Sequence, residues 1–237
     1  MANLNGRRAV VIGGASGVGF AVAEAAVAAG AEVIVGSSQT PRISAAAERL
    51  GKGAKGITVD VKDENSVAAF FNAVGDFDHL VFTAGDWGHM FSPTRELDVE
   101  GAKARMEVRF WGAARAAKHA IRRIAKDGSI TLTGGMLAHR PMPGAPLTTA
   151  SAHTTEGLAL GLARDLAPIR VNAVCLGLIM SEQVQNMGEA MIKGFTANLP
   201  LPRGGTVEEA AEAYLYLMRC TYVTGQVVRV DGGGSLV

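Results

Sequence analysis

The chain has 237 residues, of which 48% are hydrophobic and 19% are charged. This composition excludes a disordered chain, and the length is ample for one large α/β core. The formal net charge of +1 comes without a basic stripe, which argues against a nucleic-acid or membrane-surface partner. No stretch resembles a signal peptide or approaches the roughly 18 apolar residues of a membrane span. Cys175 and Cys220 are too few for a disulfide framework and lack metal-ligand spacing. We therefore expect a cytoplasmic protein without a metal site.

Apolar runs of strand length recur along the chain, at residues 9–12, 33–35, 57–59, 80–82, 130–132, 171–174 and 227–230. Most lack polar alternation, as expected of parallel strands covered on both faces. Between them lie helical signals, such as an N-cap at Thr40 before Pro41 and a capping box formed by Thr206 and Glu209. The alternation predicts a single Rossmann-type domain over residues 1–237, with helices on both faces of a doubly wound, seven-stranded parallel sheet. We expect a cofactor half up to about residue 135 and a substrate half from about residue 136.

A glycine-rich turn follows the first predicted strand and leads into an alanine-rich helix. Glycine permits a tight turn and lets backbone N–H groups approach a pyrophosphate, whose charge the positive end of the helix dipole favours. Glycines also end ordinary strands, but the strand and helix that flank this turn favour a dinucleotide site. The predicted phosphate-binding residues are Gly13, Ser16, Gly17, Val18 and Gly19.

The end of the second predicted strand indicates which dinucleotide is bound. An NAD site usually has an acidic residue about 20 residues past the glycines, where it accepts a hydrogen bond from the ribose 2′-hydroxyl. Here the chain reads Ser37-Ser38-Gln39, without an acid. Ser37 and Ser38 can donate to a 2′-phosphate, and Arg42 lies one helical turn further on. The pattern favours NADP(H) over NAD(H), although Arg42 is equally compatible with an exposed helix position.

With these motifs in place, the chain resembles the short-chain dehydrogenase/reductase family over nearly its full length. The glycine turn fits the family pattern, and Ile169 to Val174 resembles the stretch before the nicotinamide loop. Thr224-Gly225 and Asp231-Gly232-Gly233 resemble the family's C-terminal ending. The resemblance implies further cofactor contacts, near adenine from Asp60 and Val61, after the fourth strand from Thr83, Ala84 and Gly85, and near the nicotinamide from Gly177, Ile179 and Ser181.

The positions of the family's four catalytic residues carry other residues in this chain. By the resemblance, Thr148 stands at the tyrosine position, Ala152 at the lysine, Gly135 at the serine and Arg109 at the helical asparagine. A neighbouring ammonium lowers the pKa of such a tyrosine, whereas a threonine hydroxyl is far less acidic and alanine carries no charge. The usual proton donor is therefore missing, while hydride transfer itself is the chemistry of the cofactor.

Other side chains could replace the missing groups. His139 follows the fifth predicted strand and could be a general acid, or it could be a solvated loop residue. Thr133 and Thr148 could hydrogen-bond a carbonyl oxygen without protonating it. Arg109 could stabilise an oxyanion or bind a carboxylate, or it could only fill space beside the cofactor.

Three further polar residues, Asp86, His89 and His153, are considered as site or interface residues. Asp86 and His89 follow the fourth predicted strand and lie where ligands sit in such folds. His153 is interpreted as a packing or interface residue. The resemblance also implies a homodimer or homotetramer in which the helix over residues 151–167 pairs with its symmetry mate.

Three functions remain open from the sequence. The first is an NADP(H)-dependent reductase that acts on an imine or iminium, an activated alkene or a polarised ketone, all of which need little help from a protein acid. The second is a catalytically silent dinucleotide-binding sensor or partner subunit. The third is a non-redox isomerase or lyase with His139 or Asp86 as the base.

Overall fold

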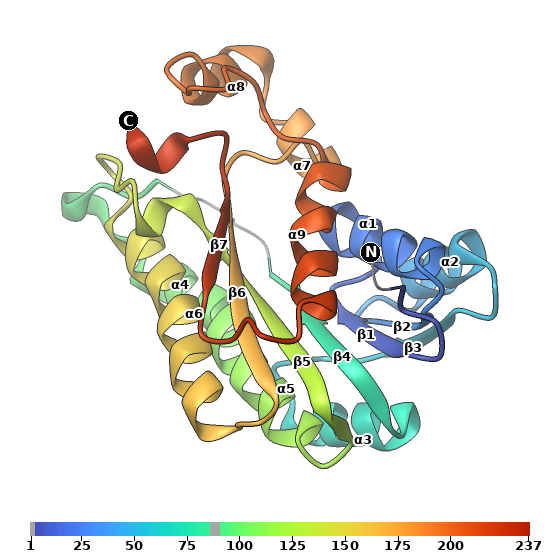
Figure 1. Cartoon of the computed structure of the whole chain (residues 1–237). Helices are drawn as coiled ribbons and strands as arrows, with labels where there is room; N and C mark the ends of the chain where they lie inside the picture. The colour runs from blue at the N-terminus through green and yellow to red at the C-terminus, as the bar shows by residue number, and fades with distance from the viewer. Residues whose placement is uncertain (1–2, 86–90) are drawn as a thin grey trace.

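The computed structural model describes residues 3–85 and 91–237. In this part of the chain, seven parallel strands form one sheet in the order β3-β2-β1-β4-β5-β6-β7 (Figure 1). The strands are β1 Arg8–Ile12, β2 Glu32–Ser37, β3 Lys55–Thr58, β4 Phe77–Phe82, β5 Ile124–Gly135, β6 Arg170–Leu176 and β7 Val227–Val230. The predicted doubly wound, seven-stranded parallel sheet is confirmed. Its strand order reverses between β1 and β4, which is where such sheets bind ligands beyond their carboxyl ends.

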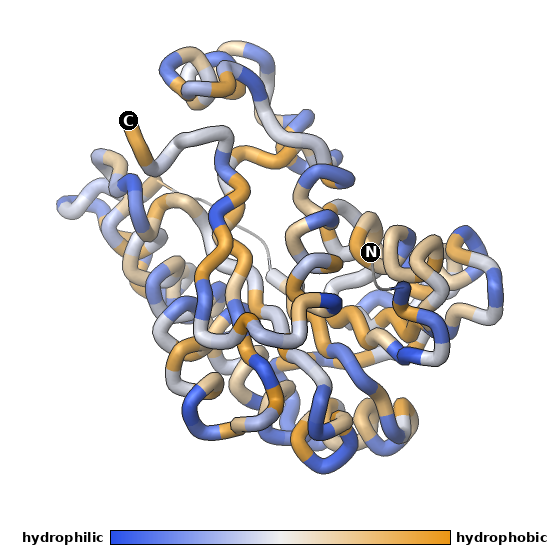
Figure 2. The backbone as a smooth tube through the Cα atoms, in the orientation of Figure 1, coloured by the Kyte–Doolittle hydropathy of each residue, from blue (hydrophilic) through white to orange (hydrophobic). Residues whose placement is uncertain are grey.

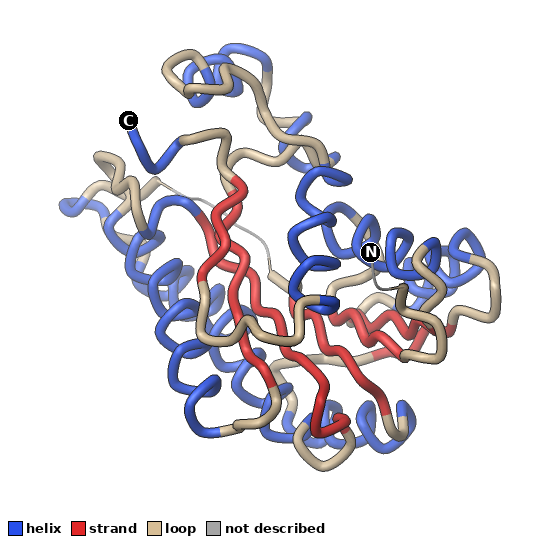
Figure 3. Tube along the Cα trace, in the orientation of Figure 1, coloured by secondary structure: helices blue, strands red, loops and turns tan. Residues whose placement is uncertain are grey.

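Helices connect the strands and cover both faces of the sheet (Figure 3). The α-helices are α1 Gly17–Ala28, α2 Thr40–Leu50, α3 Glu64–Val74, α4 Val99–Met106, α5 Gly112–Ala120, α6 Pro146–Asp165, α7 Glu182–Gln185, α8 Glu189–Thr196 and α9 Val207–Arg219. A π-helical turn over Glu107–Trp111 joins α4 to α5, and short 3₁₀ turns cover Thr94–Glu96, Met136–Ala138 and Gly234–Leu236. Among the described residues, no helix combines the length and apolarity needed to cross a membrane.

The core consists of two apolar layers, one on each face of the sheet. One layer packs α1, α2 and α9 against the sheet, and the other packs α3, α5 and α6 against its opposite face. Figure 2 shows the hydrophobic residues gathered along the central strands, with hydrophilic stretches on the outer turns. Strands buried on both faces have no polar side to alternate with, which explains the near-continuous apolar runs of the sequence.

Local capping chemistry explains several helix boundaries. The Asp63 carboxylate accepts from the Asn65 N–H at the start of α3, and the predicted capping box of Thr206 and Glu209 opens α9. The expectation at Thr40 differs from the structure, because Gln39 is the N-cap and Thr40 is the first helical residue. The Thr40 hydroxyl lies 3.0 Å from that of Thr58 and does not cap the helix.

Two predicted strands have different bounds in the structure. β3 begins at Lys55 and ends at Thr58, because its ladder with β2 is set by main-chain pairing at exposed positions that carry no hydropathy signal. β5 begins at Ile124, six residues before the predicted run, and its pairing with β4 shifts register between Phe77 and His79. The functional consequence is small, since all seven strands still end at the same edge of the sheet.

Candidate functional site

The glycine turn after β1 is packed so tightly that its glycines cannot be replaced without displacement. Gly13 has φ +93°, and a Cβ there would stand 2.6 Å from both the Ala84 nitrogen and the Thr83 hydroxyl oxygen. A Cβ at Gly19 would overlap the Gly13 carbonyl oxygen and the same Thr83 hydroxyl. The Thr83 hydroxyl is itself held by the Ile12 carbonyl at 3.2 Å. The structure therefore brings the turn and the end of β4 together, as the sequence predicted.

The start of α1 offers backbone donors to an anion. Ser16, the N-cap residue, is in an extended conformation and makes no side-chain capping bond, and α1 begins at Gly17 with φ +54°. The first N–H groups of a helix have no intrahelical partner, and an anion can satisfy them. Across the turn, Ser181 lies next to Gly17, with its Cβ 3.5 Å from the position of a Cβ on Gly17. This cradle fits the pyrophosphate of a dinucleotide, with Val18 and Gly19 in the first helical turn.

The residues predicted to bind the adenosine end lie at the neighbouring strand ends. The Gly13 N–H donates to the Gly36 carbonyl at 2.7 Å, which ties the glycine turn to the end of β2 just before Ser37 and Ser38. Ser38 and Arg42 are both exposed in the described part of the chain, where a ligand can reach them. Their exposure is compatible with a 2′-phosphate contact.

Beyond β3, the pair predicted to contact adenine adopts a fixed turn. The Asp60 carboxylate accepts from the Lys62 N–H at 3.0 Å, and the Asp60 N–H donates to the Ser66 hydroxyl at 3.0 Å. Val61 is buried, and its carbonyl accepts from Arg115 at 3.2 Å. These bonds place the Asp60-Val61 backbone firmly at the same edge of the sheet as the glycine turn.

The predicted nicotinamide stretch follows β6 and returns toward the glycine turn. The Gly177 N–H donates to the Val230 carbonyl, and a Cβ on Gly177 would stand 2.6 Å from the Asp231 Cα. Ile179 is buried, with its side chain against Gly205, so any contact from Ile179 to a carboxamide would come from its backbone. Ser181 caps α7 beside Gly17. The predicted cofactor residues thus line one continuous edge.

The positions that correspond to the family's tyrosine, lysine and serine lie at the junction of β5 and α6. Thr148 is in the first turn of α6, and Ala152 is one turn later on the same buried face. Gly134 and Gly135 end β5, and a Cβ on Gly134 would stand 3.8 Å from the Ala152 carbonyl oxygen. Neither Ala152 nor Gly135 offers a functional group, so the hydroxyl of Thr148 is the polar group that remains at these three positions.

Arg109 reaches the same edge from a π-helical turn. This turn interrupts the helix between α4 and α5, and π-turns of this kind frequently occur at functional sites. The aliphatic stem of Arg109 lies over Gly85, since a Cβ there would stand 2.6 Å from the Arg109 Cγ. Gly85 has φ +130°, so glycine is required both by the backbone conformation and by the arginine. Arg109 therefore brings a permanent positive charge to the end of β4.

The structure argues against a direct role for Thr133. Its hydroxyl donates to the Phe82 carbonyl at 2.8 Å and lies 2.8 Å from the Tyr214 hydroxyl. Burial raises the pKa of Tyr214, against the opposing effects of the Thr133 hydrogen bond and the Arg109 charge. The Tyr214 hydroxyl therefore stays protonated and donates to Thr133. Because both groups are committed to this chain of bonds, Thr133 has no donor left for a substrate.

The structure places His139 in a hydrogen-bonded cluster and not in solvent. Its Nε2 lies 2.9 Å from a Glu156 carboxylate oxygen, and its Nδ1 lies 3.1 Å from an Arg229 guanidinium nitrogen. His153 is exposed on α6, with its ring 6.0 Å from that of His139. The other two candidates, Asp86 and His89, lie outside the described residues.

Sequence reasoning missed Glu156, Arg229 and Tyr214. A signal for Glu156 was present, because it is the charged residue on a face of α6 otherwise formed by alanines and threonines, namely Thr148, Ala152, Thr155, Ala159 and Ala163. A charge on a buried face needs a partner, and the partner here comes from a distant segment. Nothing local to Arg229 or Tyr214 marked them, since each acts through contacts with strands far away in sequence.

Comparisons with known proteins agree with this geometry. The family model described as enoyl-(acyl carrier protein) reductase matches residues 13–235. The short-chain dehydrogenase/reductase ucsE of an Acremonium species is 34% identical over 253 residues, covering 96% of this chain and 94% of the relative. The short-chain dehydrogenase/reductase malC of Malbranchea aurantiaca is 30% identical over 251 residues, covering 97% and 95%.

Solved structures extend the similarity to three dimensions. The structure of the MalC reductase/Diels-Alderase from Malbranchea aurantiaca has a TM-score of 0.91 at 28% identity, covering 99% of this chain and 98% of that one. A small-chain dehydrogenase in complex with NADPH has a TM-score of 0.81 at 32% identity, covering 98% and 99%. With the glycine cradle, the strand order and these matches together, the chain belongs to the short-chain dehydrogenase/reductase family of oxidoreductases.

Proposed function

We propose that this chain is an NADP(H)-dependent reductase whose substrate needs no proton from a tyrosine–lysine pair. The observation that carries the proposal is the contrast at one edge of the sheet. The glycine cradle is complete, with Gly13 and Gly19 packed against Thr83, while Ala152 and Gly135 provide no acid–base group. A site that keeps hydride delivery and lacks its proton donor suits an imine or iminium, an activated alkene or a ketone polarised by hydrogen bonds.

The cofactor, when bound, supplies a hydride, and the residues of this chain orient and stabilise the partners. The N–H groups at the start of α1 hold the pyrophosphate. Contacts from Ser37, Ser38 and Arg42 to the 2′-phosphate would give the protein its preference for NADP(H) over NAD(H). An iminium carbon that accepts a hydride becomes a neutral amine, so no proton from the protein is required. For an activated alkene or a ketone, Thr148 hydrogen-bonds the acceptor oxygen, Arg109 stabilises its developing negative charge, and water supplies the proton.

The names of two structural neighbours support the proposal. One structural neighbour is a complex with NADPH, and the Malbranchea neighbour is named a reductase as well as a Diels-Alderase. The enoyl reductase description of the family model also denotes reduction of an activated alkene.

The test is a pair of calorimetric titrations, with NADPH and with NADH, followed by assays of NADPH oxidation with cyclic imines, activated alkenes and ketones. We expect tighter binding of NADPH and enzyme-dependent oxidation with at least one of these substrate classes. If both cofactors fail to bind in either redox state, the proposal is wrong and the glycine turn is only an inherited scaffold.

The main alternative is a catalytically silent dinucleotide-binding sensor or partner subunit, which the four changed catalytic positions favour. Binding of NADPH without turnover of any substrate would support it. Steady turnover that disappears when the cofactor site is mutated would exclude it. A non-redox isomerase or lyase that uses His139 as base is less compatible with the geometry, because both ring nitrogens of His139 already have partners.

We also propose a homodimer or homotetramer, as the sequence resemblance implied. The outer face of α6 presents His153, Gly157, Leu160, Gly161 and Arg164, and the Leu160 side chain is exposed. The glycines on this face allow close approach of a second helix. Light scattering of the wild type and of Leu160→Arg tests the assembly, and a monomeric wild type would contradict it.

A further inference from the structure

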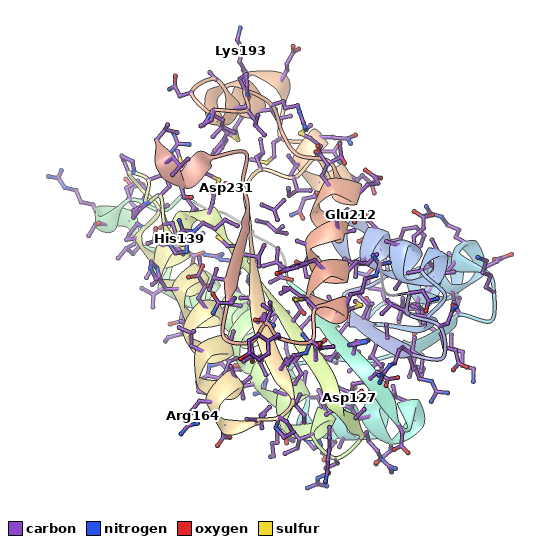
Figure 4. All side chains as sticks on the ribbon, viewed as in Figure 1. Asp127, His139, Arg164, Lys193, Glu212 and Asp231 are labelled. Carbon is purple, nitrogen blue, oxygen red and sulfur yellow. The ribbon has the colours of Figure 1, made fainter. Side chains whose placement is uncertain are left out.

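A cluster of polar side chains fills the space between α6 and the carboxyl ends of three strands. His139 follows β5, Glu156 lies on α6, Cys175 on β6 and Arg229 on β7. The potential ligand atoms of His139, Glu156 and Cys175 all lie within 4.8 Å of one another. Figure 4 labels His139 and also Asp231, which follows β7. Glu156 and Cys175 are buried, whereas His139 is partly accessible and Arg229 is exposed.

The hydrogen bonds of this cluster determine the tautomer of His139. A guanidinium can only donate, so the Nδ1 of His139, at 3.1 Å from Arg229, must accept. The proton of the neutral ring is then on Nε2, which donates to the Glu156 carboxylate at 2.9 Å. Arg229, His139 and Glu156 thus form a directional chain from an exposed cation through a neutral imidazole to a buried anion.

With this tautomer, the cluster would have to release protons before it could hold a metal ion. A histidine ligand needs a free lone pair on the nitrogen that faces the metal, and here that nitrogen carries a proton. A cysteine ligand must be a thiolate. Burial, followed by the nearby carboxylates of Glu156 and Asp231, raises the pKa of the Cys175 thiol to about 12, so the thiol stays protonated. The cluster is therefore complete as a hydrogen-bond network.

The network lies directly behind the end of β5. Glu156 is one turn beyond Ala152 on the same face of α6, and a Cβ on Gly134 would stand 3.8 Å from the Glu156 Cγ and Oε1. Gly134 and Gly135 pair with Cys175 and Leu176 in the β5–β6 ladder, but they have no side chains that pack against the surrounding residues. A buried polar network that is fully satisfied imposes one geometry on its surroundings. Glu156 therefore packs beside Gly134 and, through His139, fixes the segment that follows β5.

The same network reaches the C-terminal segment. Arg229 also lies 3.4 Å from the Ser235 hydroxyl through its second terminal nitrogen. The Asp231 carboxylate accepts from the Gly233 and Ser235 N–H groups at 2.9 Å. The final turn of the chain is thus joined, through Arg229 and His139, to the segment after β5.

We propose that Arg229, His139 and Glu156 are positioning residues that fix the backbone at the end of β5, around Gly134 and Gly135, for hydride transfer. The inference rests on the proposed reductase function for its catalytic consequence. Its structural content, the tautomer of His139 and the order of the glycine pair, is independent of turnover.

The first part of the test uses NMR, without any substrate, to measure the tautomer of His139 and the backbone order of Gly134 and Gly135. In ¹⁵N-histidine spectra of the wild-type protein, His139 should show a protonated Nε2 and an unprotonated Nδ1 near neutral pH. In amide spectra, Glu156→Met should shift or broaden the Gly134 and Gly135 signals, because it removes the acceptor of the His139 proton. Glu156→Gln keeps an acceptor oxygen of the same length and should leave these signals close to those of the wild type.

The second part measures function with NADPH and a substrate from the screen. A displacement of about 1 Å can cost roughly 100-fold in rate, so we expect Glu156→Met to slow hydride transfer at least about tenfold. The NADPH Kd should stay within about twofold, because the glycine cradle lies at the other end of the site, and Glu156→Gln should restore the rate. Arg229→Met tests the same chain from an exposed position that does not disturb the core, and Arg229→Lys is its conservative control.

The outcomes separate this inference from the proposed function. A His139 ring protonated on Nδ1, glycine signals unchanged in both Met variants, or stoichiometric zinc lost on Cys175→Ser would each overturn the positioning role. If the wild type turns over no substrate, the proposed function fails, and the histidine and glycine spectra still decide whether the network holds the backbone. Equal slowing in the Gln and Met variants would also overturn it, because it would show that the carboxylate charge and not the hydrogen bond matters.

Discussion

The two halves of the sheet's carboxyl edge differ in whether their chemistry depends on the backbone or on side chains. At β1 and β4, the cofactor cradle depends on backbone atoms and on glycines that no other residue can replace, such as Gly13 and Gly19 against Thr83. At β5 and α6, the family's chemistry depends on side chains, and by the sequence resemblance Gly135, Thr148 and Ala152 stand at those positions.

The difference teaches where sequence change is tolerated. A phosphate held by backbone N–H groups constrains the shape of the turn, so the small residues remain. A proton donor is a single side chain on a scaffold that folds equally well without it, so it can be lost while the fold is kept. The second region has then acquired groups of its own, with Arg109 over Gly85 and the chain of Arg229, His139 and Glu156.

We expect the largest effect, a loss of NADPH binding, from a substitution in the glycine turn. In Gly19→Ala the new Cβ overlaps the Gly13 carbonyl oxygen and the Thr83 hydroxyl, so the turn must open. We expect NADPH binding, measured by calorimetry, to weaken by more than about 1000-fold, or about 4 kcal/mol. Gly194→Ala is the matched control, since a Cβ on this glycine in α8 meets nothing within 4 Å. The control should bind NADPH normally and gain about 0.5–1 kcal/mol in unfolding free energy. Wild-type affinity in Gly19→Ala would refute the cradle.

The next largest effect is a loss of turnover without a loss of NADPH binding. Arg109→Met removes the positive charge at the end of β4, and with an activated alkene or ketone we expect kcat to fall by about 100- to 1000-fold. The NADPH Kd should change little, because Arg109 does not belong to the glycine cradle. Arg109→Lys should recover only part of the rate, since an ammonium lacks the planar fork of donors. Arg122→Met, at an exposed position just after α5, is the control for loss of a positive charge. Full activity of Arg109→Met would leave Arg109 as a space-filling residue.

The amino edge of the sheet provides a stability effect unrelated to either region. His79 is buried beside Ser129, with its Nδ1 2.9 Å from the Ser129 hydroxyl, and burial lowers the pKa of His79 to about 4. Below pH 6.5 the unfolded chain binds a proton at this histidine that the folded protein does not bind. The contribution of His79 to stability is therefore complete above pH 6.5 and is lost as the pH falls toward 4, by up to about 3 kcal/mol.

Urea unfolding at several pH values measures this effect. His79→Asn should show a shallower loss of unfolding free energy between pH 6.5 and 4 than the wild type, whatever its absolute stability. Identical slopes in the two proteins would show that His79 is protonated in the fold and that its burial is relieved by other means.

The smallest expected effect is a change in the preference for NADPH over NADH. Ser38→Asp introduces a negative charge where a 2′-phosphate is expected, so NADPH should bind about tenfold more weakly while NADH binds as well as before or better. Ser44→Asp adds the same charge further along α2, on an exposed residue, and should not change the ratio of the two affinities. If Ser38→Asp weakens NADPH and NADH equally, Ser38 does not select the cofactor.

Much of the fold and the cofactor edge could be predicted from residues close together in sequence. The glycine turn, the capping box of α9 and the apolar strand runs are local signals, because backbone conformation and helix capping involve neighbours within a few residues. The catalytic side could be predicted only as a set of replaced positions. The interpretation of Thr133 as a substrate donor failed in the geometry, since its hydroxyl is held by Phe82 and Tyr214 from strands and helices up to 81 residues away.

The sequence by itself determined the order of strands and helices along the chain, and it predicted where a dinucleotide would bind and which residues stand at the family's tyrosine and lysine positions. Only the tertiary structure decided which side chains surround those positions. His139 meets Glu156 over 17 residues and Arg229 over 90, because parallel pairing sets Cys175 level with both Gly134 and Arg229. Such contacts depend on the register of three strands and the packing of one helix on them, and no local pattern records either.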